Sequence, residues 1–194
     1  MFSEIRIYYE GDVRLKEGFR AFFGEIEERA KAKGLPFRLI DTNGDPDGDF
    51  GIAIRSNPNA WNILLKDSEH PHSQKQSRAL CTKNHWSASH ANSIFWMVEM
   101  MESWFHADKD TLGKFYGNGF KRSALKTNPR VEQISKKDLE SGLRAATKAT
   151  PKGNYFDHKA EHGGRLLSLI DPKLVRQAAP NCEKLFAAVL ARFS

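Results

Sequence analysis

The sequence predicts an α/β fold, a mainly parallel sheet flanked by helices, with a helical C-terminal portion. Three observations support this prediction. Apolar segments of strand length alternate with segments of helical period over the first 70 residues. Two of the strand-like segments end in acidic side chains, one at Glu10 and the other at Asp67 and Glu69. Beyond residue 110, the predicted elements are all helices.

The chain begins with a predicted strand and helix. Residues 5–9 are rich in Ile and Tyr and are followed by Glu10 and a glycine, which is typical of a short strand. In residues 13–33 the apolar side chains recur at helical spacing, and Gly34 is suited to end that helix.

The next elements repeat this alternation. A second strand is predicted at 37–40 and a shorter helix at 45–56, which Asp45 can cap. The third strand covers 60–65. The order is therefore β-α-β-α-β, and such alternation favours a parallel sheet.

The rest of the chain divides into a polar segment and a series of helices. Residues 70–93 are polar and irregular and predict a long loop, whereas 94–107, the most apolar stretch, predicts a buried helix. We expect residues 1–110 to form the α/β core, and 111–194 to form a basic, mostly helical portion packed on it as one compact unit. Its predicted helices span 110–116, 137–147, 158–170, 172–178 and 181–192.

The composition is that of an ordinary globular protein, with 194 residues, 40% hydrophobic and 28% charged. The N-terminus does not resemble a signal peptide, no apolar run reaches membrane-spanning length, and two cysteines make no disulfide framework, so we expect a cytoplasmic protein without membrane partners. The sequence also lacks the glycine-rich phosphate-loop and dinucleotide motifs, which excludes common ATPase and NAD-dehydrogenase classes.

The charge is distributed unevenly along the chain. Residues 1–109 carry 14 Lys and Arg against 16 Asp and Glu, whereas residues 110–194 carry 16 against 8. A basic second half suits contact with the phosphate backbone of DNA or RNA. The alternative is a solvated basic surface without a partner.

The acidic residues at the strand ends are the first candidates for chemistry. Asp67 and Glu69 are two positions apart, so an extended backbone would point both side chains to one side. Together with Glu10 they could hold Mg²⁺ or Mn²⁺, which prefer carboxylate ligands. Alternatively, the pair merely begins a polar loop.

Further acidic residues interrupt the apolar stretch. Glu99 and Glu102 share one face of the predicted helix, and Asp108 lies near its end. A carboxylate among apolar side chains is costly to bury unless it is paired or bound to a metal. Each could extend the acidic cluster or pair with a basic residue of the second half.

Two other groups of polar residues contain side chains that can bind a metal ion or a phosphate. Cys81, His85 and His90, with His70 and His72, do not have the spacing of a recognised zinc finger. A short C-terminal stretch gathers donors suited to phosphate contact, with a solvated helix face as the alternative. These candidate nucleic-acid-binding residues are Lys152, Tyr155, Lys159, His162 and Arg165.

The order strand-Glu10-Gly11-helix, followed later by strand-Asp67-Ser68-Glu69, resembles the topoisomerase-primase (Toprim) superfamily. More narrowly, residues 60–69, 97–108 and 152–172 resemble an uncharacterised bacterial family of small Toprim-like proteins, often encoded beside AAA-type ATPases in defence loci.

This resemblance implies a function and roles for the acidic residues. Glu10 would be the general acid or base, and Asp67 with Glu69 would hold Mg²⁺ or Mn²⁺ for phosphodiester cleavage, with an AAA-type ATPase as partner. Glu69 departs from the expected Asp by one methylene. The alternative is a non-catalytic Toprim-like module that binds a partner protein or nucleic acid.

Overall fold

A four-stranded sheet forms the centre of the protein in the computed structural model, which describes residues 2–42, 44–71 and 75–193. The strand order is β2-β1-β3-β4, and every neighbouring pair is parallel. The strands are β1 (Ile5–Tyr9), β2 (Phe37–Asp41), β3 (Trp61–Asp67) and β4 (Ile94–Met97). Their carboxyl ends lie at one edge of the sheet, and the predicted α/β fold is confirmed.

Helices make up most of the remaining described chain. The α-helices are α1 (Lys16–Phe22), α2 (Gly24–Ala32), α3 (Pro46–Ser56), α4 (Gln76–Lys83), α5 (Lys109–Tyr116), α6 (Lys136–Thr147), α7 (Lys159–Leu167), α8 (Pro172–Ala178) and α9 (Pro180–Leu190). Short 3-10 helices lie between them, namely η1 (Val13–Leu15), η2 (Ala88–Ser93), η3 (Met101–Ala107), η4 (Arg122–Ala124), η5 (Val131–Gln133) and η6 (Tyr155–His158).

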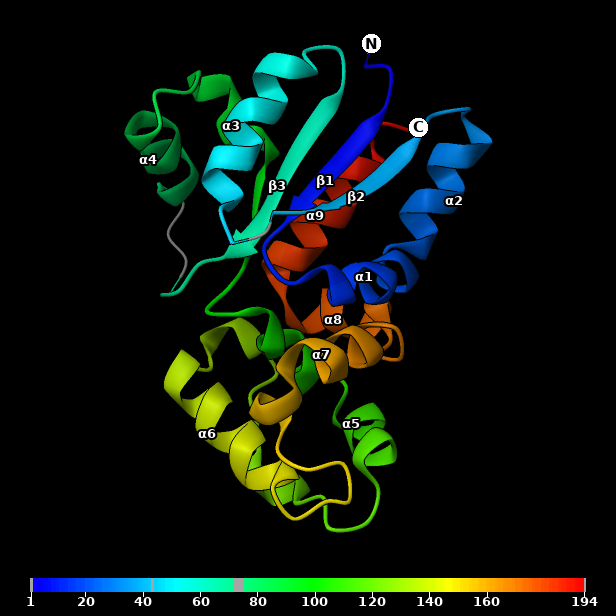
Figure 1. Ribbon diagram of the computed structural model, residues 1–194, viewed down its shortest axis with the longest axis vertical. Coiled ribbons are helices and arrows are strands. Elements are labelled where there is room, and N and C mark those ends of the chain that lie inside the picture. Colours follow the sequence, from blue (N-terminus) through cyan, green and yellow to red (C-terminus); the bar gives the residue numbers. More distant parts are fainter. Residues whose placement is uncertain (1, 43, 72–74, 194) are drawn as a thin grey trace.

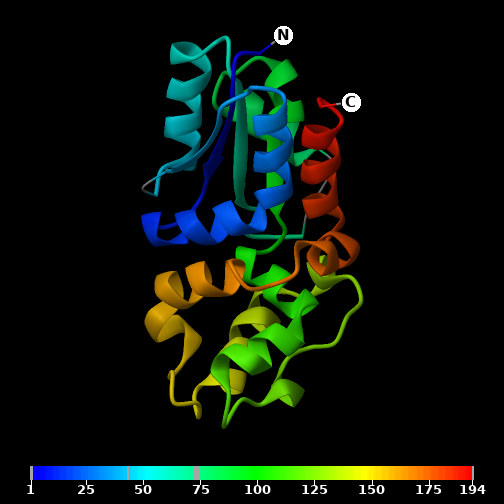
Figure 2. The ribbon, with the colours of Figure 1, turned by 90° about the vertical axis from the view of Figure 1, so that its right-hand side faces the viewer.

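The elements are arranged as a covered sheet with a second body beneath it. Helices α3 and α4 lie on one side of the sheet and α2 and α9 on the other (Figures 1 and 2). Residues 109–167, with α5, α6 and α7, form a helical lobe beyond the carboxyl edge of the strands (Figure 1). Within the described residues, no helix combines the length and apolar character that a bilayer crossing requires.

Alternation along the strands divides the buried side chains between two cores. Ile7 and Tyr9 belong to the larger core, whereas the intervening Tyr8 belongs to a smaller core with Phe50 of α3. Both faces of the sheet are therefore buried, as in parallel sheets generally. The larger core also includes residues of the helical lobe and of α9, so it extends to both sides of position 110.

The most apolar stretch is not the buried helix that its composition predicts. Residues 94–97 form strand β4, which pairs with β3, and η3 follows after a bend at Val98 and Glu99. The helix prediction was wrong because a strand buried on both faces is apolar at every position, and its run cannot be distinguished from a buried helix by periodicity. The predicted long loop at 70–93 is also wrong for residues 76–83, which form α4, and for residues 88–93, which form η2.

Two helix boundaries also differ from the sequence prediction. The helix predicted at 13–33 is divided into η1, α1 and α2, with a break at Phe23, where φ is −91° and ψ is 17°. The cap of α5 is Asp108 rather than Asp110, because an Asp108 Oδ1 accepts the backbone N–H of Thr111 at 3.1 Å.

The helical lobe joins the sheet layer through a very close helix contact. A Cβ added at Gly18 of α1 would lie 2.3 Å from the carbonyl oxygen of Gly164 in α7, and one added at Gly164 would lie 2.4 Å from the carbonyl oxygen of Arg14. The two backbones therefore meet directly, and α7 lies directly below α1 in both views (Figures 1 and 2). Only glycine leaves enough room at these positions.

We expect Gly18→Ala to lower the free energy of unfolding by about 1–3 kcal/mol or more, because the added methyl group would push α1 and α7 apart. Gly24→Ala is the matched control, since nothing lies within 4 Å of a Cβ added at this helical glycine. Urea denaturation of both variants measures the difference. Equal stability of Gly18→Ala and the wild type would contradict the close contact.

Candidate functional site

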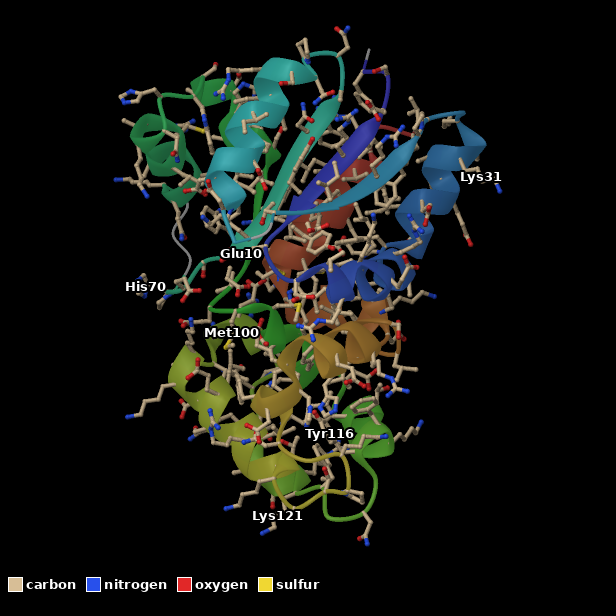
Figure 3. All side chains as sticks on the ribbon, viewed as in Figure 1. Glu10, Lys31, His70, Met100, Tyr116 and Lys121 are labelled. Carbon is tan, nitrogen blue, oxygen red and sulfur yellow. The ribbon has the colours of Figure 1, made fainter. Side chains whose placement is uncertain are left out.

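Two of the predicted carboxylates lie at the carboxyl edge of neighbouring strands. Glu10 directly follows β1, and Asp67 is the last residue of β3, which pairs with β1 in parallel. The Oε2 of Glu10 accepts the backbone N–H of Asp67 at 3.1 Å. Figure 3 shows Glu10 at the end of the strands that faces the helical lobe.

A third carboxylate, Glu102, reaches this edge from η3. Its side chain is completely buried. One oxygen, Oε1, accepts the hydroxyl of Tyr155 at 2.7 Å and lies 3.2 Å from the ammonium of Lys159. The other oxygen, Oε2, is buried and has no hydrogen-bond partner among the described residues.

Asp67 lies between these two acidic neighbours. Burial raises the pKa of Asp67 well above its ordinary value, and the charges of Glu102 and Glu10 raise it further, against the opposing effect of Lys159. Asp67 also accepts the backbone N–H of Met101 at 2.8 Å through Oδ1. Glu10, Asp67 and Glu102 thus form one cluster, which we call the acidic cluster.

The pKa values of the other groups follow from the same crowding. Burial raises the pKa of Glu10, and the ammonium of Lys66 opposes that effect. Burial alone would lower the pKa of Lys159, but the carboxylates of Glu102 and Asp67 outweigh it and raise the pKa. Lys159 therefore stays protonated and supplies positive charge to the cluster.

Glu69 lies past the end of β3, where its charge adds to the effect of burial and raises the pKa of Glu10. The strand ends at Asp67, and Glu69 has a φ of 62°, so the rule that residues two apart share a face of a strand no longer applies. The carboxylate of Glu69 is half-exposed and pairs with the ammonium of Lys136 at the start of α6. Glu69, which the sequence predicts to be a metal ligand, is therefore paired with a lysine in this structure.

The other acidic candidates serve the ends of helices. Glu99 is buried, and its Oε2 accepts the backbone N–H of Lys136 at 2.9 Å, in the first turn of α6. Asp108 caps α5, and its second oxygen accepts the backbone N–H of Asp171 at 3.1 Å. Glu102 is therefore the additional acidic candidate that reaches the acidic cluster.

The five predicted phosphate-contacting residues do not form one surface. Tyr155 and His162 are buried, Tyr155 against Glu102 and His162 against the hydroxyl of Tyr116, 3.1 Å from its Nδ1. Lys152 and Arg165 are exposed and lie over the ring of Phe115, with their charged groups 5.1 and 6.0 Å from its centroid. Of the five residues, Tyr155 and Lys159 lie at the acidic cluster.

An open cleft of about 430 Å³ lies beside the cluster. Asp67, Ser68 and Glu69 line it from the strand end, and α4 supplies the opposite wall. Lys66 borders it too, with its ammonium 2.6 Å from Asp47. No group of three His, Cys, Asp or Glu side chains in the described residues is already arranged to hold a metal ion, and His72 lies outside those residues.

Comparison with known proteins gives one match. A family model described as a domain of unknown function (DUF4276) matches residues 20–190, which is most of the chain. Neither a curated protein nor a solved structure matches.

We expect Asp67→Asn to stabilise the metal-free protein at neutral pH. Because the pKa of Asp67 is raised on folding, the folded state holds a proton that the unfolded state releases, and the free energy of unfolding falls as pH rises above the ordinary carboxyl range. Asparagine keeps an oxygen that can accept the backbone N–H of Met101, and it does not ionise. We therefore expect the free energy of unfolding of Asp67→Asn to exceed that of the wild type by at least about 1 kcal/mol at pH 7.5 and by less near pH 4.5.

Urea denaturation in a chelator at both pH values measures this gain. Asp157→Asn is the matched control because Asp157 is exposed on the helical lobe, and it should change stability little at either pH. A loss of stability in Asp67→Asn at both pH values would contradict the crowding of the carboxylates.

Proposed function

The chain belongs to the DUF4276 family of domains of unknown function, and we propose that it is a metal-dependent enzyme that cleaves phosphodiesters, of the nuclease type. The observation that carries the proposal is the acidic cluster at the carboxyl edge of the sheet, where α/β folds generally place their chemistry. The Toprim-like assignment is part of this proposal. It is supported by the positions of Glu10 after β1 and Asp67 at the end of the adjacent strand β3.

The donor chemistry of the cluster suits a hard divalent cation. Glu10, Asp67 and Glu102 are the residues that would hold Mg²⁺ or Mn²⁺. The unpartnered Oε2 of Glu102 supports this fit, because a buried carboxylate oxygen without a partner is costly. When bound, the ion would polarise the phosphodiester and stabilise the charge that develops on it.

The neighbouring residues would handle protons and charge. Glu10 has a raised pKa, which brings it closer to the operating range of a general acid or base, the role that the Toprim resemblance implies. Lys159 is protonated beside Glu102 and can also offer its ammonium to a phosphate oxygen. Glu69 would have to leave Lys136 before it could act as the further metal ligand that the resemblance implies.

The helical lobe supports nucleic acid as the substrate. Several of its lysines and arginines are exposed, and the chain from residue 110 onward carries twice as many basic as acidic residues. These basic side chains would contact the phosphate backbone of a nucleic acid that is bound at the acidic cluster. Exposed basic residues of the lobe include Lys121, Lys126, Arg130, Lys137, Lys152 and Arg165.

A second function is a non-catalytic module that binds a partner protein or nucleic acid. This function is favoured by the ion pair between Glu69 and Lys136. It is also favoured because, in the described residues, no group of three His, Cys, Asp or Glu side chains is arranged to hold a metal ion. An AAA-type ATPase is the partner that the family resemblance implies for either function.

We expect the purified protein to cleave plasmid DNA or RNA in the presence of Mn²⁺ or Mg²⁺. Glu10→Gln and Asp67→Asn should each lower the cleavage rate by at least about 100-fold, because both remove a carboxylate of the cluster. Gel assays of the two variants beside the wild type and a Glu161→Gln surface control measure this. Equal cleavage by the wild type and both cluster variants would exclude the proposed site.

Metal binding can be tested without cleavage. A cation that binds only the folded protein raises the melting temperature, so Mn²⁺ should stabilise the wild type and have little effect on Glu102→Gln. Lys159→Met should bind Mn²⁺ more tightly than the wild type, because it removes a competing positive charge from the cluster. Thermal melts over a Mn²⁺ titration measure both effects, and no stabilisation of the wild type would favour the non-catalytic module.

A further inference from the structure

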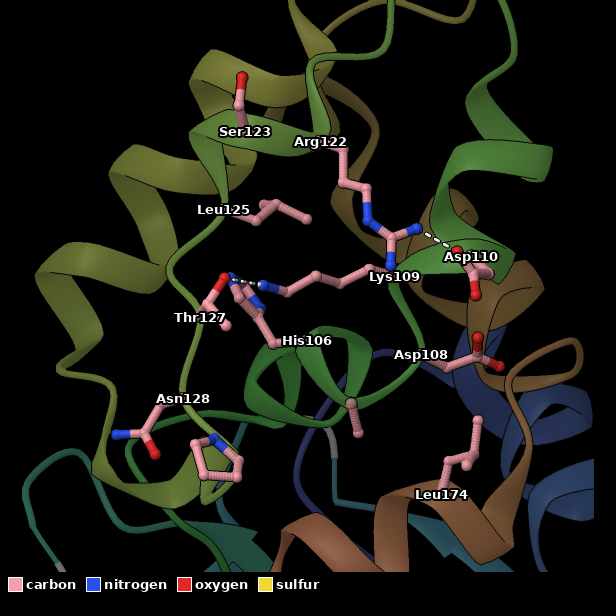
Figure 4. A pocket seen from close by; sticks show the side chains of 12 residues that line it. His106, Asp108, Lys109, Asp110, Arg122, Ser123, Leu125, Thr127, Asn128 and Leu174 are labelled. Carbon is pink, nitrogen blue, oxygen red and sulfur yellow. Dashed lines mark hydrogen bonds and ion pairs between the residues drawn. The ribbon is translucent and has the colours of Figure 1, made fainter.

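A second cleft, of about 710 Å³, does not contain the acidic cluster. It lies between η3 and α5 on one side and residues 122–129 on the other, with Leu174 of α8 at its margin (Figure 4). Its volume falls in the range of small-molecule sites. Nothing in the proposed phosphodiester chemistry uses it.

A buried histidine lines this cleft with one ring nitrogen unused. His106 is 3% exposed, and its Nδ1 lies 3.3 Å from the carbonyl oxygen of Glu102. Because a carbonyl can only accept, Nδ1 carries the hydrogen and Nε2 presents a lone pair. Nε2 is buried and has no partner in the described residues, so it lacks a hydrogen-bond donor.

The imidazole is neutral at physiological pH. Burial lowers its pKa to about 4, although the hydrogen bond to Glu102 acts in the opposite direction, and the ammonium of Lys109 lowers it further. Figure 4 shows His106 rising from η3 toward the side chains of Lys109 and Thr127. The acceptor therefore lies beside a cation.

The two cations of the cleft differ in their partners. Lys109 donates only to uncharged oxygens, the carbonyl of Lys126 at 2.7 Å and the hydroxyl of Thr127 at 3.1 Å, and has no carboxylate partner among the described residues. Burial lowers its pKa, and the charge of Arg122 lowers it further. Arg122 pairs with the exposed Asp110.

The remaining carboxylate of the cleft, Asp108, has other partners. Both oxygens of Asp108 already accept backbone N–H groups, one in α5 and one at the start of α8. An anion between Lys109 and Arg122 would relieve the repulsion between them. Leu125 and Leu174 add an apolar wall, and the Leu174 side chain is left 41% exposed.

We propose that this cleft binds a small phosphate ester of nucleotide size. Its phosphate lies against Lys109 and Arg122, its hydroxyl or amino group donates to Nε2 of His106, and its apolar part contacts Leu125 and Leu174. The site is separate from the acidic cluster and needs no metal ion.

The test uses three probes with the full chain in a chelator, which keeps it independent of the proposed cleavage activity. Adenosine 5′-monophosphate carries all three features, ribose 5-phosphate lacks the base, and adenosine lacks the phosphate. Isothermal titration calorimetry should show saturable binding of adenosine 5′-monophosphate. The affinity for each of the other two probes should be lower by about tenfold or more.

Two variants and a control locate the binding. Leu174→Trp fills the cleft from an exposed position, so it should fold and abolish binding of every probe. Lys109→Met should weaken the binding of adenosine 5′-monophosphate to the level of adenosine. Lys114→Met changes an exposed lysine of the same helix and should leave the binding unchanged. No saturable binding of adenosine 5′-monophosphate, or binding unaffected by Leu174→Trp, would overturn the proposal.

Discussion

The complete burial of the Glu102 carboxylate is the constraint on which the rest of the structure depends. A buried charge is tolerated only when hydrogen bonds and opposite charge compensate it. Tyr155 and Lys159 provide this compensation, and both come from the helical lobe. The lobe is therefore held at the sheet edge by the hydrogen bond and the ion pair with Glu102, in addition to apolar packing.

The alternation of strands and helices in the first 70 residues could be predicted because apolar patterns, glycines and caps all agree there. The prediction failed at residues 94–107, where β4 and η3 replace a helix. A strand in the middle layer has no polar face, so its pattern carries no period that would identify it. Pairing with β3, which is a tertiary contact, determines the outcome.

The site was predictable where it depends on strand topology. Glu10 and Asp67 follow neighbouring parallel strands, and they come together as expected. The sequence prediction also pointed the side chains of Asp67 and Glu69 to one side, which assumes that the strand continues to Glu69. The strand ends at Asp67 instead, and Glu69 has a positive φ. Glu102 was a candidate from its apolar surroundings, but its partners Tyr155 and Lys159 are more than 50 residues away in the chain.

The glycine contact between α1 and α7 determines how the protein can meet a large ligand. Hinge and shear motions need interfaces whose side chains can adopt a second packing, and here the backbone of one helix lies directly against the backbone of the other at Gly18 and Gly164. A change in the angle between the sheet and the lobe would therefore disturb this contact. A polymer would meet the open cleft that Asp67 lines, whereas Glu102 is completely buried, and selection among ligands would depend on the shape and charge of that cleft.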